Sequence, residues 1–139
     1  MKIFTEHIVL NTKGKFDIID ITGEIEKNLR MTELEEGNVT IFNPGSTAGI
    51  TTVEYEPGLI KDIRNAFQKL IPEGERYFHD DTWHDGNGHA HIRSSLLKTS
   101  LTVPFRKAKL ILGTWQQVIF IEFDNKARQR KVVTQFIGI

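Results

Sequence analysis

The stretch VIFIEFDNKARQRKVVTQFI, residues 118–137, decides the fold class of this chain. It contains two runs of β-branched and aromatic residues, Val118–Phe123 and Val132–Ile137, which are typical of buried strands. Between them lies the polar segment Asp124–Lys131, in which four of the last six residues are Lys or Arg. Because a short polar connection usually joins antiparallel neighbours, we expect a β-hairpin with a solvated basic tip.

Further strands are expected on the N-terminal side of this stretch. The expected strands are Ile3–Leu10, Phe16–Ile21, Val39–Asn43, Ile50–Glu54, His89–Leu97 and Lys109–Leu112, with a hairpin turn at Thr12–Lys15 and a turn at Pro44–Thr47. Two helices are expected, one at about 23–35 and one that begins at Pro57, carries apolar residues at helical spacing to Leu70, and ends before Pro72. The sequence therefore predicts one α+β domain over residues 1–139, mainly antiparallel sheet with one or two flanking helices.

Composition and charge exclude several classes of protein. The 139 residues contain 18 Lys and Arg against 18 Asp and Glu, which argues against nucleic-acid binding through the basic segment at 126–131 and against a membrane-surface protein. The chain has no cysteine, so disulfides, thiolate nucleophiles and cysteine-ligated zinc are excluded. We see neither a signal-peptide pattern nor an apolar run of about 20 residues, so a cytoplasmic location is expected.

Four of the five histidines fall within residues 79–91. If 89–97 is a strand, His89 and His91 project from the same face, with Arg93 and Ser95 continuing that row. His79, arriving from the long loop 73–88, can close a three-imidazole site for a divalent metal ion. Zinc is favoured for such a site and magnesium is the alternative. The same spacing also fits histidines that simply face solvent.

Other polar residues can take part in the chemistry. Asp80, Asp81 and Asp85 are near enough to be ligands or to accept hydrogen bonds from the imidazole rings. The turn 43–49, with two glycines and two hydroxyls, can present backbone N–H groups to an anion, although a hairpin connection is the simpler interpretation. Glu54 lies at the end of a predicted strand, where it can act as a base or simply be solvated. Trp115 can line a pocket or fill the core.

Five motifs together resemble a known family. They are NPGSTAGIT at 43–51, EYEPG at 54–58, NGHAHIRSSL at 87–96, LTVP at 101–104 and LGTWQ at 112–116. This combination, spread from about residue 3 to residue 138, resembles the YjbQ family, also called the secondary thiamine-phosphate synthase family. The resemblance implies a small sandwich-like β fold with flanking helices, assembled as a homotrimer. It also implies a histidine-lined pocket near a subunit boundary that binds a metal ion or an anion.

The resemblance also assigns roles to individual residues. Carried over by position, His79, His89 and His91 become metal ligands. The expected substrate-binding residues are Ser46, Thr47, Ser95, Thr114 and Gln116, and the expected catalytic residues are His89, Glu54 and Arg93. Some relatives have a histidine where this chain has Gly45-Ser46, which leaves a fourth metal ligand open.

The resulting hypothesis is a metal-binding enzyme that acts on a small phosphorylated molecule, with thiamine-phosphate synthase activity implied by the family name. Arg93 and the hydroxyls of Ser46 and Thr47 would hold the phosphate, and Glu54 or an aspartate would move protons. Imidazole ligands suit water activation at least as well as the magnesium-dependent loss of pyrophosphate that a synthase needs. A metal-assisted hydrolase and a non-catalytic trimer that binds metal or ligand are therefore the alternatives.

Overall fold

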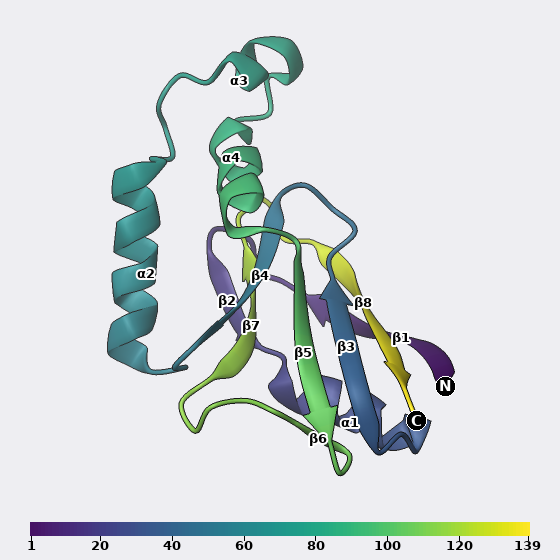
Figure 1. Ribbon diagram of the computed structural model, residues 1–139. Helices are drawn as coiled ribbons and strands as arrows, with labels where there is room; N and C mark the ends of the chain where they lie inside the picture. Colours follow the sequence, from purple (N-terminus) through teal and green to yellow (C-terminus); the bar gives the residue numbers. More distant parts are fainter.

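Two antiparallel sheets lie face to face in the computed structural model, which describes residues 1–139 (Figure 1). The larger sheet has the strand order β1-β8-β3-β5-β6, and the smaller one has the order β2-β7-β4. The strands are β1 (Lys2–Asn11), β2 (Asp17–Asp20), β3 (Glu36–Phe42), β4 (Ala48–Val53), β5 (Ser100–Arg106), β6 (Lys109–Leu110), β7 (Gln117–Glu122) and β8 (Gln129–Gly138). Every pairing is antiparallel, which confirms the predicted α+β class and its mainly antiparallel sheet.

Four helices flank the sheets, against the one or two that were expected. They are α1 (Thr22–Thr32), α2 (Pro57–Leu70), α3 (Phe78–Trp83) and α4 (Gly88–Leu97). The prediction of α2 is confirmed: Pro57 occupies its first position, and the Glu56 side chain accepts the backbone N–H groups of Gly58 and Leu59. None of the four helices is long and apolar enough to cross a lipid bilayer.

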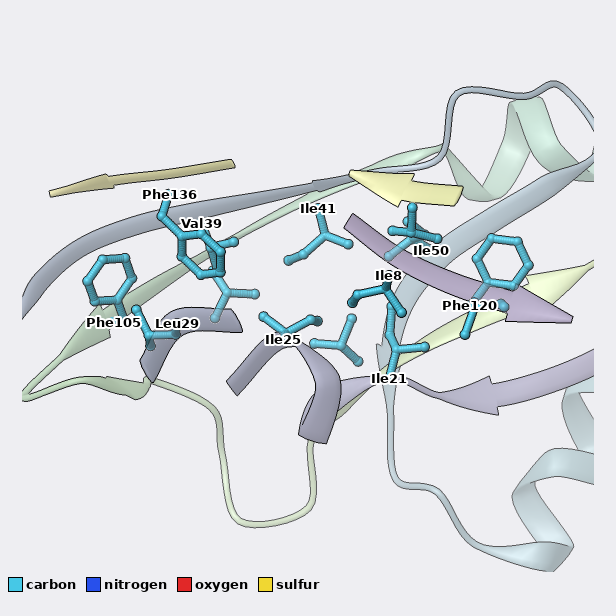
Figure 2. Close-up of a cluster of buried hydrophobic side chains, with 14 of the residues drawn as sticks. Ile8, Ile21, Ile25, Leu29, Val39, Ile41, Ile50, Phe105, Phe120 and Phe136 are labelled. Carbon is cyan, nitrogen blue, oxygen red and sulfur yellow. The ribbon is translucent and has the colours of Figure 1, made fainter. Parts of the chain in front are cut away.

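The main core lies between the sheets and is closed by α1. Apolar side chains from alternate positions of β3 and β8, such as Val39, Ile41 and Phe136, point into it and meet Ile25 and Leu29 of α1 (Figure 2). All these side chains are fully buried. Burial of a side chain of this size contributes about 1.5–3 kcal/mol, so this cluster is the main source of stability.

A second core covers the outer face of the smaller sheet. Ile119 and Ile121 of β7 pack there against Phe67 of α2 and Ala90 of α4. Since the alternate residues Val118 and Phe120 belong to the main core, β7 is buried on both faces. Strand β7, the central strand of the smaller sheet, therefore fixes the position of α4.

Three expected hairpins are wrong. β1 and β2, β3 and β4, and β7 and β8 each belong to different sheets, so the chain crosses between sheets at residues 12–16, 43–47 and 123–128. Each strand finds its partner elsewhere; β1, for example, pairs with β8 over its whole length. The first crossing turns sharply, because Lys15 and Phe16 both have positive φ.

The expected strand at 89–97 is also wrong, because this segment is helix α4. The predicted loop at 73–88 contains the short helix α3, which projects beyond α4 at one end of the molecule (Figure 1). Strand β5 was missed, although its residues 101–104 belong to one of the motifs. The physical reason for the α4 error is that the buried face of this helix carries His89, Arg93 and Ser94, which hydropathy does not recognise as a core face.

Candidate metal centre and polar cavity

Helix α4 separates the predicted site residues into two sets. On a strand, His89, His91, Arg93 and Ser95 would share one face, but on a helix residues four apart share a face. His91 and Ser95 accordingly lie on the outer side of α4, whereas His89 and Arg93 are turned inward and are 2% and 3% exposed. The conformation of this one segment thus decides which histidines can meet.

His79 of α3 is the centre of a group of possible metal ligands. One ligand atom from each of His79, Asp80 and Asp85 lies within 4.8 Å of the others. The Nδ1 atom of His79 is 3.4 Å from Oδ1 of Asp80 and 3.5 Å from Oδ1 of Asp85. The ring of His91 lies beside that of His79, with 4.3 Å between the ring centroids and an angle of 41° between the ring planes. His89 is not part of this group, so the structure does not bring the three predicted imidazoles together at one point.

Glycine at position 88 allows α3 to dock on α4. A Cβ atom built on Gly88 would lie 2.4 Å from Cβ of Tyr77, the residue before α3. The Gly88 N–H donates to Oδ1 of Asp80 at 2.9 Å, which ties the two helices together. Gly88, which directly precedes the expected strand at 89–97, is therefore at a close helix–helix contact.

The ionisation of this group suits a cation. Partial burial would raise the pKa of Asp80, but hydrogen bonds from the Gly88 N–H and from His79 outweigh burial and lower it. Burial and the neighbouring His79 lower the pKa of His91, although Asp85, Asp124 and Asp80 oppose this shift. An ionised carboxylate and a neutral imidazole are the forms that bind metal ions.

A polar cavity of about 350 Å³ opens beside His91. No hydrophobic residue lines it; the lining residues are Gly45, Ser46, His91, Ser94, Ser95, Lys98 and Thr99. The Ser94 hydroxyl donates to the carbonyl of Ala48 at 2.6 Å and fixes α4 against β4. Since Lys98 is the one lysine or arginine in the lining and no acidic residue is present, the cavity is suited to an anion.

A buried ionic network holds the three crossing segments behind this cavity. Glu122 at the end of β7 is fully buried and accepts hydrogen bonds from Arg130 and from the Thr12 hydroxyl. Arg130 also donates to the Thr47 hydroxyl at 2.8 Å. Thr47 is therefore a structural residue here rather than part of the cavity lining, and Arg130 folds inward instead of extending into solvent as the expected basic tip would.

The same network reaches the loop that carries Asp85. Asp124 accepts hydrogen bonds from Thr47, Arg128 and Asn87, at 3.1, 3.1 and 3.2 Å. Asn87 Oδ1 in turn accepts the N–H of Asn125, whose side-chain amide donates to the carbonyl of Asp85 at 2.7 Å. The backbone between α3 and α4 is thus held by groups other than His79, Asp80 and Asp85.

Arg93, a predicted catalytic residue, points away from His91. Its Nε donates to the carbonyl of Ile71 at 2.9 Å, and Nη2 donates to Oε1 of Gln68 at 3.0 Å. It lines a different cavity, between α2, α4 and the segment before β2. Arg93 therefore cannot hold a ligand in the cavity beside His91 of the same chain.

Glu54, Thr114 and Gln116 lie at the far end of the smaller sheet. Glu54 and Thr114 line an open cavity of about 470 Å³, and Gln116 lies near it, with Nε2 3.5 Å from the Thr52 hydroxyl. Ser94 contacts the first residue of β4, and Glu54 directly follows its last. A six-residue strand is about 20 Å long, so Glu54 does not reach His91 within one chain.

Several residues of the site were not identified from the sequence. Lys98, Glu122, Asp124 and Arg130 were not chosen as candidates, although a single glutamate within the apolar run VIFIEF was a usable signal. A carboxylate in a buried strand needs a partner, and the arginines of the following segment were the nearest candidates. Lys98 had no such signal, since its place beside His91 depends on α4 being a helix.

Comparisons with known proteins agree on one family. The profile of the family described as "UPF0047 protein YjbQ-like" matches residues 6–139. A UPF0047 protein of Archaeoglobus fulgidus is 39% identical over 126 residues, covering 91% of this chain and 96% of that protein. The UPF0047 protein YugU of Bacillus subtilis is 38% identical over 131 residues, covering 93% of this chain and 96% of that protein.

Solved structures show the same fold. A YbjQ-like protein of unknown function from Sulfolobus solfataricus has a TM-score of 0.93 at 29% identity, covering 99% of each chain. An uncharacterised protein of the yjbq/upf0047 family from Clostridium acetobutylicum has a TM-score of 0.87 at 35% identity, covering 95% of this chain and 99% of that one. The two-sheet arrangement described above is therefore shared along nearly the whole length.

Proposed function

This chain belongs to the UPF0047/YjbQ-like family, and from the arrangement around His91 we propose that it is a metal-dependent enzyme that acts on a small phosphorylated molecule. One observation carries the proposal: the ring of His91 lies beside that of His79, a member of the His79, Asp80 and Asp85 group, and His91 also lines the polar cavity that contains Lys98. A group that can hold a cation and a cavity that can hold an anion therefore share a wall.

The ligand set fits a divalent ion. His79, Asp80 and Asp85 offer one nitrogen and two carboxylate oxygens, and His91 lies beside this group, with its ring centroid 4.3 Å from that of His79. Mixed imidazole and carboxylate ligands favour zinc or another late first-row ion over magnesium, which prefers oxygen ligands alone. Such an ion supplies Lewis-acid polarisation of a phosphate oxygen or an activated water. We accordingly replace the predicted ligand His89 by the two aspartates.

The residues of the cavity would bind and orient the phosphate. Lys98 supplies a positive charge, and the Ser46 hydroxyl supplies a hydrogen-bond donor, whereas the Ser95 hydroxyl donates to the carbonyl of His91 at 2.9 Å. His91, neutral because its pKa is lowered by burial and by His79, can accept a proton at the boundary between the two parts of the site. These roles replace the ones predicted for Arg93 and Thr47.

Two types of reaction fit the proposal, and each needs its own assay. Hydrolysis of a phosphate or pyrophosphate ester needs only an activated water, and a thiamine-phosphate synthase reaction also needs a place for the leaving pyrophosphate. The cavity of about 350 Å³ has room for a phosphate and part of a small organic group. A protein that only binds metal and ligand would saturate with both and release no product.

We also propose that the protein is a homotrimer whose cavity lies near a subunit boundary. Ile92 and Leu96, four residues apart on α4 next to His91, are 46% and 59% exposed, and Trp83 of α3 is exposed as well. Exposed apolar side chains beside a polar cavity are typical of a surface that a partner covers. A neighbouring copy would also allow Glu54 or Gln116 to approach His91, which they do not reach within one chain. A cytoplasmic location remains a prediction.

The proposal is tested by metal content and turnover together. Protein purified without chelator should contain about one divalent ion per chain, and His79→Ala and Asp85→Asn should lose both the ion and any phosphoester turnover. Lys98→Ala should keep the ion and raise the KM for the phosphorylated substrate, which separates the two halves of the site. His84→Ala is the matched control, since His84 lies on α3's C-terminal side but outside the ligand group. Retention of the ion by His79→Ala would refute the metal site.

The proposed homotrimer is tested separately by light scattering, which should give three times the chain mass of 15.9 kDa.

A further inference from the structure

A second cavity, of about 260 Å³, lies on the inner side of α4 and has no lining residue in common with the cavity beside His91. Three cationic side chains line it, Lys15, Arg64 and Arg93, against a single carboxylate, that of Glu73. None of the three cations has a carboxylate within 4.0 Å. The cavity therefore has an excess of positive charge that the protein does not neutralise.

The most unusual of these cations is Arg93, which is only 3% exposed. Its hydrogen-bond partners, the Ile71 carbonyl and the Gln68 side chain, are both uncharged. Burial of a charge without a directly paired counterion is costly, and burial accordingly lowers the pKa of Arg93, although the charge of Glu73, which is more than 4.0 Å away, opposes the shift. A bound anion would remove this cost, because it would restore a counterion to a group already fixed in position.

Hydrogen-bond donors other than those of Arg93 are also available around the cavity. Oε1 of Gln68 accepts from both Arg93 and the N–H of Glu73, which leaves its Nε2 without a protein partner. Arg64 uses Nη2 to donate to the carbonyl of Phe16 at 3.2 Å and has further N–H groups available. The cavity thus offers an amide, two guanidinium groups and an ammonium.

The segment before β2 is held in a costly conformation that places Lys15 at the cavity. Lys15 and Phe16 have φ of 49° and 68°, a region that non-glycine residues seldom adopt. Their N–H groups donate to the carbonyls of Asp124 and Glu122 at 2.9 and 2.8 Å, which fixes the turn. The Phe16 ring lies under both guanidinium groups, 5.3 Å from Arg93 Cζ and 5.9 Å from Arg64 Cζ.

We propose that this cavity binds the oxyanion group, phosphate or carboxylate, of a small molecule, as a site separate from the one beside His91. Guanidinium and ammonium groups bind either oxyanion through charge-assisted hydrogen bonds. The volume is below the range of about 300–1,000 Å³ that is typical of drug-sized ligands, so the ligand is a small ion or metabolite. The rings of Phe16 and Phe123 provide an apolar wall for its carbon atoms.

The test uses the metal-depleted protein, so that its outcome does not depend on the proposed function. Inorganic phosphate is titrated at constant ionic strength into ¹⁵N-labelled protein, and acetate is titrated in a parallel experiment. The amides of Asn65 and Gln68 report this cavity, and those of Ser46 and Ser95 report the cavity beside His91. We expect saturable shifts at Asn65 and Gln68 with at least one of the two anions; the anion that binds more tightly identifies the class.

The double variant Lys15→Gln/Arg64→Gln should weaken that binding by about tenfold or more, since hydrogen bonds to charged groups carry at least that much affinity. Arg93 is left intact, because truncating a buried side chain also perturbs folding. Lys27→Gln removes the same charge from the exposed side of α1, where it lines none of the cavities, and should leave the affinity unchanged. The proposal is overturned if neither anion shifts Asn65 and Gln68 beyond the effect of chloride, or if the double variant binds as tightly as Lys27→Gln.

Discussion

Arg130 of β8 binds both carboxylate oxygens of Glu122 of β7, with Nε 2.7 Å from Oε2, and so joins the last strands of the two sheets. Glu122 is completely buried and the Arg130 side chain is nearly so. Around this pair, the hydroxyls of Thr12 and Thr47 bring in the other two crossing segments. The three segments that cross between the sheets are thus held together by a buried polar cluster, whereas hairpin turns would join the strands of a simpler sheet.

Loss of one member of this pair should destabilise the protein strongly. Arg130→Ala leaves Glu122 buried without its counterion, which costs about 3–5 kcal/mol of unfolding free energy. Urea denaturation at pH 7 measures this loss of unfolding free energy. Arg106→Ala is the control, because its pair with Glu36 is 3.9 Å long and exposed on both sides, and should cost less than about 1 kcal/mol. Equal losses in the two variants would mean that the Glu122 pair is not a source of stability.

Asp124 should make stability depend on acid pH. Burial alone would raise the pKa of Asp124, but hydrogen bonds from the Lys126 N–H, Asn87, Thr47 and Arg128 outweigh burial, and the pKa is lowered. An acid with a lowered folded-state pKa contributes its stability above its unfolded value of about 3.9, and loses it as the pH falls toward the folded value.

Asp124→Asn, which cannot ionise, should therefore be less stable than the wild type by about 2 kcal/mol at pH 7. Denaturation at several pH values should show a constant difference from pH 7 to pH 5 and a shrinking one below about pH 4. A difference that stays the same down to pH 3 would show that folding does not lower the pKa of Asp124.

His89 should make the protein less stable as the pH falls from 7 to 5. Burial and the positive charge of Arg93 lower the pKa of His89, although Glu73, Asp80 and the Gly86 backbone oppose the shift. The unfolded chain then binds more protons than the folded one below about pH 6.5, so the unfolding free energy should fall as the pH drops from 7 to 5.

His89→Gln should reduce this pH dependence, measured by denaturation in the presence of a chelator so that metal binding does not contribute. Some slope should remain, because the pKa of His91 is also lowered, and His89→Gln/His91→Gln should be flat in this range. If His89→Gln keeps the full slope of the wild type, the buried imidazole is not its source.

Secondary structure was predicted correctly in most segments where apolar periodicity reports burial, although β5, in which Leu101, Val103 and Phe105 alternate with other residues, was missed. In β8 and α2 the apolar residues alternate with the period of a strand or a helix, because one face of each element contacts other apolar side chains. In α4 the buried positions also follow a helical period, but Gly88, His89, Ala90, Arg93 and Ser94 occupy them. No scale of hydrophobicity identifies a core face that is built of histidine, arginine and serine.

The errors in topology have a different cause. The polar segments at 12–15, 44–47 and 124–131 have the composition of turns, and composition does not distinguish a hairpin from a crossing between two sheets. The distinction depends on partners more than 80 residues away in the chain, such as Thr47 with Arg130 and Thr12 with Glu122. The error at the candidate site has the first of these causes, since the histidines at 89 and 91 were assigned to a strand and lie on helix α4.

Gly88 gives the sharpest test of how α3 and α4 build the candidate site. Gly88→Ala places a Cβ 2.4 Å from Cβ of Tyr77, so α3 must shift away from α4. The shift separates His79 and Asp80 from Asp85 and His91, and should weaken zinc binding at least tenfold, with a stability loss of about 1–3 kcal/mol. Gly23→Ala in α1 is the matched control: a Cβ there meets nothing within 4 Å, and alanine is the better helix former, so stability should stay the same or rise by up to about 1 kcal/mol. Competition with a chromophoric zinc chelator measures the affinity. Unchanged zinc affinity in a folded Gly88→Ala variant would place the metal-binding residues elsewhere than at the contact between α3 and α4.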